Sequence, residues 1–168
     1  MASLTRADVI AMLARERDLK TGSAPWTVKF IERASTQFGE WRDIEIDAAA
    51  ALDIILPPHN GEPCKGDRIE LVPSGGATVA EATRTLRVIR SEYERNNQTC
   101  WGRIAQAFDQ PFSTLLLTTA PLEADEYRSL TPVAGRLYHL DGFHRLIGWA
   151  FAKRLTEDVR LRALVAQV

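Results

Sequence analysis

The densest group of residues capable of chemistry lies between Tyr138 and Arg145, which reads Tyr-His-Leu-Asp-Gly-Phe-His-Arg. The pattern predicts a short strand, a turn at Asp141-Gly142, and a helix whose first turn carries His144 and Arg145. At such a helix start, the first backbone N–H groups lack intrahelical partners and the helix dipole is positive. Because the Arg145 guanidinium lies beside these groups, the segment favours a bound anion, most of all a phosphate.

The same segment offers a second chemistry, based on metal ligation. His139 and Asp141 are two positions apart, so a regular strand places both side chains on one face. With His59 or His144 as a third ligand, they would form the donor set of a 2-His-1-carboxylate iron site. We keep this metal site as a less favoured alternative to the phosphate site.

Simpler structural interpretations exist for two of these groups. Arg145 could form an ion pair with an acidic residue upstream, such as Glu123 or Asp125. The polar, Gly- and Pro-rich loop at residues 57–67, which contains His59, is typical of a turn, with a pocket wall as the alternative.

Composition limits the classes of protein to consider. The chain has 168 residues, of which 45% are hydrophobic, enough for one core, so we expect a single domain over residues 1–168. A formal net charge of -1 provides no global basic field, so we do not expect a nucleic-acid partner. No segment approaches the roughly 18 consecutive apolar residues of a membrane span, and no signal peptide is evident, so we expect a cytoplasmic protein. Cys64 and Cys100 lack CxxC spacing, which favours reduced thiols over a disulfide scaffold or a zinc site.

Apolar periodicity predicts an α+β (mixed α/β) fold. Helical spacing and capping residues predict helices near residues 5–20, 26–34, 78–96, 101–108 and 143–151. Alternating or β-branched runs predict strands at residues 43–46, 68–72, 112–119, 137–141 and 159–166, whereas residues 48–56 fit either state. In the helix at 143–151, the pattern places Phe143, Leu146, Ile147, Ala150 and Phe151 on the apolar face and Arg145, Gly148 and Trp149 away from it.

The motif Asp141-Gly142-Phe143-His144-Arg145, with a hydrophobic strand upstream and another strand after the helix, resembles the ParB/sulfiredoxin-like superfamily. Within it, the motif is nearest to that of the free-serine kinases. The resemblance implies a core at residues 41–168 preceded by an N-terminal helical extension at residues 1–40. It also implies that Gly142, His144 and Arg145 contact nucleotide phosphates and that Asp141 lies beside the transferred phosphoryl group.

Departures from the family narrow what the resemblance implies. Phe143 stands where sulfiredoxins carry their reactive Cys, so a thiol-based repair reaction is not expected. The chain also lacks the arginine box and the helix-turn-helix segment of partition proteins. Free-serine kinases place a catalytic Glu early in the chain; Glu40, Glu45 and Glu62 are the candidates, no motif chooses among them, and we take Glu45 as the working assignment.

Together these observations lead to the hypothesis of a nucleotide-dependent phosphotransferase that acts on a small hydroxylated metabolite or free amino acid. ATP or another nucleotide would be the donor, and Asp141 would hold Mg²⁺ or accept the hydroxyl proton. Asp141, Glu45 and His144 would be catalytic, while Gly142, His144 and Arg145 would bind the nucleotide. The alternative is a non-catalytic module that binds a nucleotide or another phosphate ligand. The sequence does not determine the oligomeric state, and a homodimer is one of the possible states.

Overall fold

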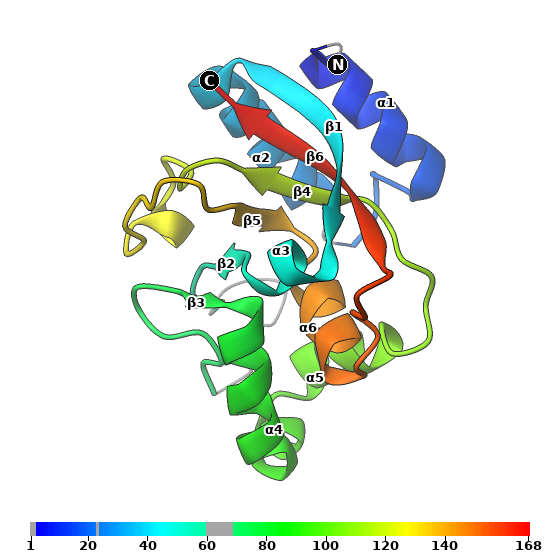
Figure 1. Cartoon of the computed structure of the whole chain (residues 1–168), viewed down its shortest axis with the longest axis vertical. Helices are drawn as coiled ribbons and strands as arrows, with labels where there is room; N and C mark the ends of the chain where they lie inside the picture. The colour runs from blue at the N-terminus through cyan, green and yellow to red at the C-terminus, as the bar shows by residue number, and fades with distance from the viewer. Residues whose placement is uncertain (1–2, 23, 60–68) are drawn as a thin grey trace.

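The structure is a computed structural model that describes residues 3–22, 24–59 and 69–168 (Figure 1). It is an α+β fold, as the sequence predicts. In chain order the elements are α1 (Arg6–Glu16), α2 (Ala24–Phe38), β1 (Glu40–Asp47), α3 (Ala48–Leu52), β2 (Ile55–Leu56), β3 (Ala77–Thr78), α4 (Val79–Asn96), α5 (Gln98–Gln106), β4 (Leu115–Thr118), the 3-10 helix η1 (Asp125–Tyr127), β5 (Tyr138–Asp141), α6 (Phe143–Phe151) and β6 (Arg160–Gln167).

The strands form one mixed six-stranded sheet in the order β1-β6-β4-β5-β2-β3. β6 pairs antiparallel with β1 and parallel with β4. β5 pairs antiparallel with β4 and parallel with β2, and β3 adds an antiparallel edge. The sheet therefore combines long, regular pairing at the β1–β6 end with short strands around β5, where the candidate site lies.

Helices cover both faces of this sheet because its inner strands are apolar on both sides. Along β4, Leu115 and Leu117 belong to a core shared with α4, α5 and α6, whereas Leu116 belongs to a second core shared with α1 and α2. Figure 1 shows the two groups of helices at opposite ends of the molecule. The predicted N-terminal extension thus contributes α1 and α2, whose Val9 and Ile31 are fully buried against the sheet.

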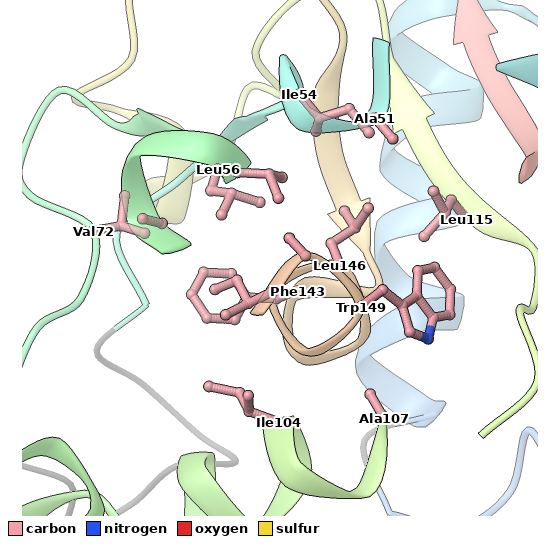
Figure 2. Close-up of a cluster of buried hydrophobic side chains, with 14 of the residues drawn as sticks. Ala51, Ile54, Leu56, Val72, Ile104, Ala107, Leu115, Phe143, Leu146 and Trp149 are labelled. Atoms are coloured by element: carbon pink, nitrogen blue, oxygen red, sulfur yellow. The ribbon is translucent and has the colours of Figure 1, made fainter. Parts of the chain in front are cut away.

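α6 is the central helix of the larger core. Figure 2 shows Phe143, Leu146 and Trp149 pointing from this helix in different directions: Leu146 toward Ile54 and Ala51, Trp149 toward the side of Leu115, and Phe143 to the side opposite Trp149. The predicted face of α6 is therefore too narrow: Gly148 and Trp149 are buried too. The reason is that α5 covers the side of α6 that the pattern assigns to solvent, and a Cβ on Gly148 would lie 2.5 Å from the carbonyl oxygen of Ile104.

Two other predictions concern the region before α4. The predicted strand at residues 68–72 is wrong for its described part, because residues 69–72 form no strand. Instead, the side chain of Asn97 accepts from the backbone N–H of Ile69 (2.9 Å) and donates to its carbonyl (2.6 Å), so a side-chain amide replaces the strand partner. The ambiguous stretch 48–56 divides into α3 and β2. None of the described helices has the length and apolarity to cross a membrane.

Candidate functional site

A cavity of about 390 Å³ opens where α6 begins. Its walls come from six parts of the chain: the C-terminal end of α1, α2, the segment after β2, α5, η1, and the turn from β5 into α6. The polar side chains of its lining are His59, His139, His144, Arg17, Arg103, Arg145, Asp141, Glu126, Thr27 and Tyr127. All three histidines of the chain are among them, as is the whole predicted motif from Asp141 to Arg145.

Gly142 forms the turn between β5 and α6 in a left-handed conformation, with φ of 113°. A Cβ at this position would lie 2.7 Å from Cδ2 of Leu115 and 3.2 Å from Nη2 of Arg145. Both the dihedral angle and the space therefore require glycine. The close neighbours belong to the protein itself, so the glycine is explained without a ligand.

Asp141 is the centre of a charged group that joins three helices. Its Oδ2 accepts a hydrogen bond from Nη2 of Arg145 (2.6 Å) and forms an ion pair with Nη2 of Arg17 (2.8 Å). Its Oδ1 accepts a hydrogen bond from the hydroxyl of Thr27 (3.1 Å). Burial alone would raise the pKa of Asp141, but the guanidinium groups of Arg145 and Arg17 outweigh it and lower the pKa to about 2.

The guanidinium of Arg145 is largely occupied by the protein. Besides Asp141, it donates through Nη1 to the hydroxyl of Ser113 and to the carbonyl oxygen of Thr114 (3.2 Å). Arg145 therefore forms an ion pair, as its structural interpretation expects, but its partner is Asp141 rather than Glu123 or Asp125. Arg145 lines the cavity, yet its hydrogen bonds to Asp141, Ser113 and Thr114 show a residue that holds the turn together.

A β-bulge separates His139 from Asp141. The register shifts in β4, so that Leu117 is opposite His139 while Leu116 is opposite Asp141. Opposed residues of antiparallel strands project to the same side, and Leu116 faces α1 and α2. Asp141 accordingly meets Arg17 and Thr27 there, and the expectation that His139 and Asp141 share one face is wrong.

His139 is buried, with 7% of its surface exposed, and neither ring nitrogen has a hydrogen-bond partner among the described residues. Its nearest ring contact is edge-on with Phe143, at 5.9 Å between centroids. Burial lowers the pKa of His139 to about 3, although Asp141 opposes the shift. The imidazole is therefore neutral, with one donor and one acceptor available at the cavity.

His144 lies on the other side of the α6 start and faces α5. Its Nε2 is 3.3 Å from Sγ of Cys100, and its ring meets that of His59 edge-on at 4.9 Å. Burial is the main cause that holds the pKa of His144 well below its usual value, and the neighbouring His59 and Arg103 lower the pKa further. Cys100 is disulfide-bonded, so the expectation of reduced thiols is not met at this residue.

The remaining predicted residues lie apart from the cavity. Glu45 is exposed on β1, opposite Arg162 of β6, and does not line the cavity. Glu40 is at the start of the same strand and lies 3.8 Å from Arg42. Glu62 falls outside the described residues. Neither of the described candidates for a catalytic glutamate, Glu40 and Glu45, therefore lies at the cavity beside the Asp141–Arg145 motif.

Two partners of Asp141 were not predicted from the sequence: Arg17, which caps the C-terminal end of α1, and Thr27 of α2. They are 124 and 114 positions from Asp141, and neither belongs to a recognisable motif.

A family model described as a family of unknown function, DUF6309, matches residues 14–168. The chain belongs to this family. No curated protein and no solved structure matches this DUF6309 protein.

The family match includes the whole cavity of this DUF6309 protein, because the lining begins at Arg17 and ends at Arg145. The cavity does not bring together the ligands of the alternative iron site, which are His139, Asp141 and a further histidine. Among the described residues, the group whose atoms could hold a metal ion is His59, Cys100 and His144, without His139 or Asp141. The cavity therefore presents two distinct polar clusters, one around Asp141 and one around His144.

Proposed function

We propose that this DUF6309 protein binds a nucleotide in the cavity at the start of α6. The volume of about 390 Å³ is at the lower end of the range for small-molecule sites, which suits a nucleotide better than a macromolecule. The charge of the lining supports an anion. Three guanidinium groups (Arg17, Arg103 and Arg145) face two carboxylates (Asp141 and Glu126), which leaves one excess positive charge when the histidines are neutral.

The observation that carries the proposal is the partly unsatisfied guanidinium of Arg17. Among the described residues, its buried Nε has no hydrogen-bond partner, and its Nη2 is paired only with Asp141, at 2.8 Å. Buried donors of this kind are costly unless something accepts from them. A phosphate in the cavity supplies acceptor oxygens of the right charge. Arg17 is therefore assigned the phosphate contact, and Arg145 the role of holding Asp141 and the turn.

His139 supports a ligand that has hydroxyl or amide groups as well as charge. Its two ring nitrogens are buried and unpartnered at the cavity wall, where the neutral ring can donate one hydrogen bond and accept another. The ribose hydroxyls of a nucleotide are suitable partners. With a pKa of about 3, the imidazole is too weak a base to take a proton from an alcohol, so its role is in binding.

An aromatic wall supports a planar ring in the ligand. Trp26 and Phe30 of α2 and Tyr127 of η1 line the cavity. The rings of Phe30 and Tyr127 pack edge to face at 5.9 Å, and Trp26, which is 40% exposed, continues the wall outward at 6.5 Å from Phe30. Stacking on aromatic side chains contributes about 1–3 kcal/mol per nucleobase.

Phosphoryl transfer to a hydroxylated metabolite is the second candidate function. It is favoured by Asp141, a carboxylate that stays ionised and lines the same cavity. However, two guanidinium groups already neutralise this carboxylate, so Mg²⁺ would have to displace Arg17 or Arg145 from it. We therefore place nucleotide binding first, and we leave Mg²⁺ and transfer to the experiment.

Calorimetric titration with AMP, ADP and ATP, each with and without Mg²⁺, tests the proposal. Arg17→Ala should weaken nucleotide binding by about 1.5–3 kcal/mol, as for a lost charge-assisted hydrogen bond. Arg128→Ala is the matched control, because Arg128 is exposed, pairs with Asp125 and is not part of the lining. Equal affinities of the Arg17→Ala and Arg128→Ala variants, or no binding of any of the three nucleotides, would overturn the proposal.

The second candidate has its own readout. The nucleotide that binds is incubated with Mg²⁺ and a panel of free amino acids, and phosphorylated products are measured. Asp141→Asn should abolish transfer if the carboxylate takes part in it. Binding without transfer to any acceptor favours the non-catalytic module.

A further inference from the structure

Three side chains with metal-binding atoms meet on the side of the cavity away from Asp141. His59 follows β2, Cys100 is on α5, and His144 is in the first turn of α6. One ligand atom from each, the sulfur or a ring nitrogen, lies within 4.8 Å of the others. Nε2 of His144 and Sγ of Cys100 are 3.3 Å apart.

We propose that this cluster, in the reduced chain, binds one Zn²⁺ ion through His59, Cys100 and His144. Two imidazoles and one thiolate are the ligand types that Zn²⁺ prefers, whereas Mg²⁺ and Ca²⁺ take oxygen ligands, which the set lacks. Three protein ligands leave the fourth position of a tetrahedral zinc ion open to water or a ligand. His59 and His144 both line the cavity, so the open position would face it.

The packing of α5 against α6 supports the placement of two of the ligands. Gly148 is the point of close approach, since a Cβ there would lie 2.5 Å from the carbonyl of Ile104 and 2.7 Å from Cβ of Ala107. Cys100 is four residues before Ile104, and His144 is four residues before Gly148. Residues four apart lie one above the other on a helix, so both ligands are one turn from the same crossing. The small residue at the crossing thereby fixes the distance between them.

Ring packing supports the third ligand. The ring of His59 stacks on that of Phe143, with centroids 4.2 Å apart and an angle of 16° between planes. It also meets His144 edge-on at 4.9 Å. These contacts hold the imidazole of His59 over the start of α6 without requiring the metal.

The oxidation state of Cys100 controls the proposed site. The residue is disulfide-bonded in this structure, and a disulfide sulfur is not the thiolate that zinc requires. A dithiol reductant supplies two electrons and two protons, which convert the protein disulfide into two thiols while the reductant becomes a disulfide. The Cys100 thiol then releases its proton as the zinc–sulfur bond forms. Oxidation reverses these steps and expels the metal.

Cobalt substitution tests the proposal without any nucleotide, so its outcome is independent of the proposed function. The full chain is reduced with a phosphine, freed of metal with a chelator, and titrated with Co²⁺ under anaerobic conditions. We expect one Co²⁺ per chain, the visible bands of a tetrahedral site, and a thiolate-to-cobalt charge-transfer band. Zn²⁺ should displace the cobalt, and the disulfide form should show no such bands.

Variants assign the ligands. Cys100→Ser should remove the charge-transfer band, and His59→Ala and His144→Ala should each weaken binding by at least about 100-fold, beyond the usual effect of an outer-shell change. His59 is half-buried outside any helix or strand, so its variant serves if Cys100→Ser does not fold. His139→Leu, which changes the one histidine outside the cluster, is the control and should retain the site. Absence of the charge-transfer band in the reduced chain, or equal binding by His59→Ala and the wild type, would overturn the proposal.

Discussion

The burial of His139 predicts that the protein loses stability on mild acidification. In the unfolded chain this imidazole has its ordinary pKa of about 6.5, whereas burial lowers the pKa to about 3 in the folded protein. Between these values the unfolded chain binds a proton that the folded protein does not. The free energy of unfolding is therefore highest above pH 6.5 and falls as the pH decreases toward 3.

The magnitude follows from the two pKa values. Each pH unit in this window contributes about 1.36 kcal/mol, so His139 alone should lower the free energy of unfolding by about 2.5 kcal/mol between about pH 7 and pH 4.5. His144, whose pKa is also lowered by burial, acts in the same direction. Asp141 does not interfere, because its pKa is lowered to about 2 and its contribution is lost only below about pH 4.

Comparison with His139→Leu isolates the effect of this one side chain. Leucine retains an apolar volume at a site where neither ring nitrogen has a partner among the described residues, so the variant should fold and be of similar or higher stability at neutral pH. Urea unfolding followed by tryptophan fluorescence, at about pH 7 and pH 4.5, gives both free energies. The wild type should lose about 2.5 kcal/mol more than the variant over this interval. Equal losses in the two proteins would refute the assignment of a neutral, buried imidazole.

Two glycine substitutions test the packing that positions the site. Gly148→Ala should destabilise the protein by about 1–3 kcal/mol in thermal or urea unfolding, because the new Cβ meets the carbonyl of Ile104 at 2.5 Å. Gly102→Ala in α5, where nothing lies within 4 Å, is its control and should be neutral or stabilising by up to about 1 kcal/mol. Gly142→Ala should cost at least about 1–3 kcal/mol, since it combines a φ of 113° with a 2.7 Å contact to Leu115; an unchanged melting temperature would contradict this strain.

Local patterns in the sequence predict most of the helices and strands. Thr78, for example, is a capping residue that predicts the start of α4, and in the structure its side chain accepts from the backbone N–H of Glu81. Local patterns fail where another part of the chain supplies the partner. Residues 69–72 alternate like a strand, yet the amide of Asn97 satisfies the backbone of Ile69. Trp149 lies off the expected apolar stripe, yet it is buried with Phe112 at 5.0 Å between ring centroids.

The candidate site shows the same division. The residues from Asp141 to Arg145 are consecutive, so one motif identifies the turn and the helix start. The bulge opposite Leu116 does not follow from the sequence of β5, and it changes which face Asp141 occupies. The contacts of Asp141 with Arg17, and of His144 with Cys100, join distant segments through tertiary packing. Residue spacing contains no information about such pairs.

The position of β6 in the sheet has a consequence for the order in which the protein folds. This strand follows all the others in the chain, yet it lies inside the sheet between β1 and β4, with Glu40 opposite Gln167. During synthesis, β1 and β4 emerge from the ribosome with the edges that β6 will occupy still unpaired. Exposed edges of this kind bind other strands readily. Completion of the sheet must therefore follow translation of residues 160–167, and until then the nascent chain is most exposed to aggregation and to chaperones that hold extended segments.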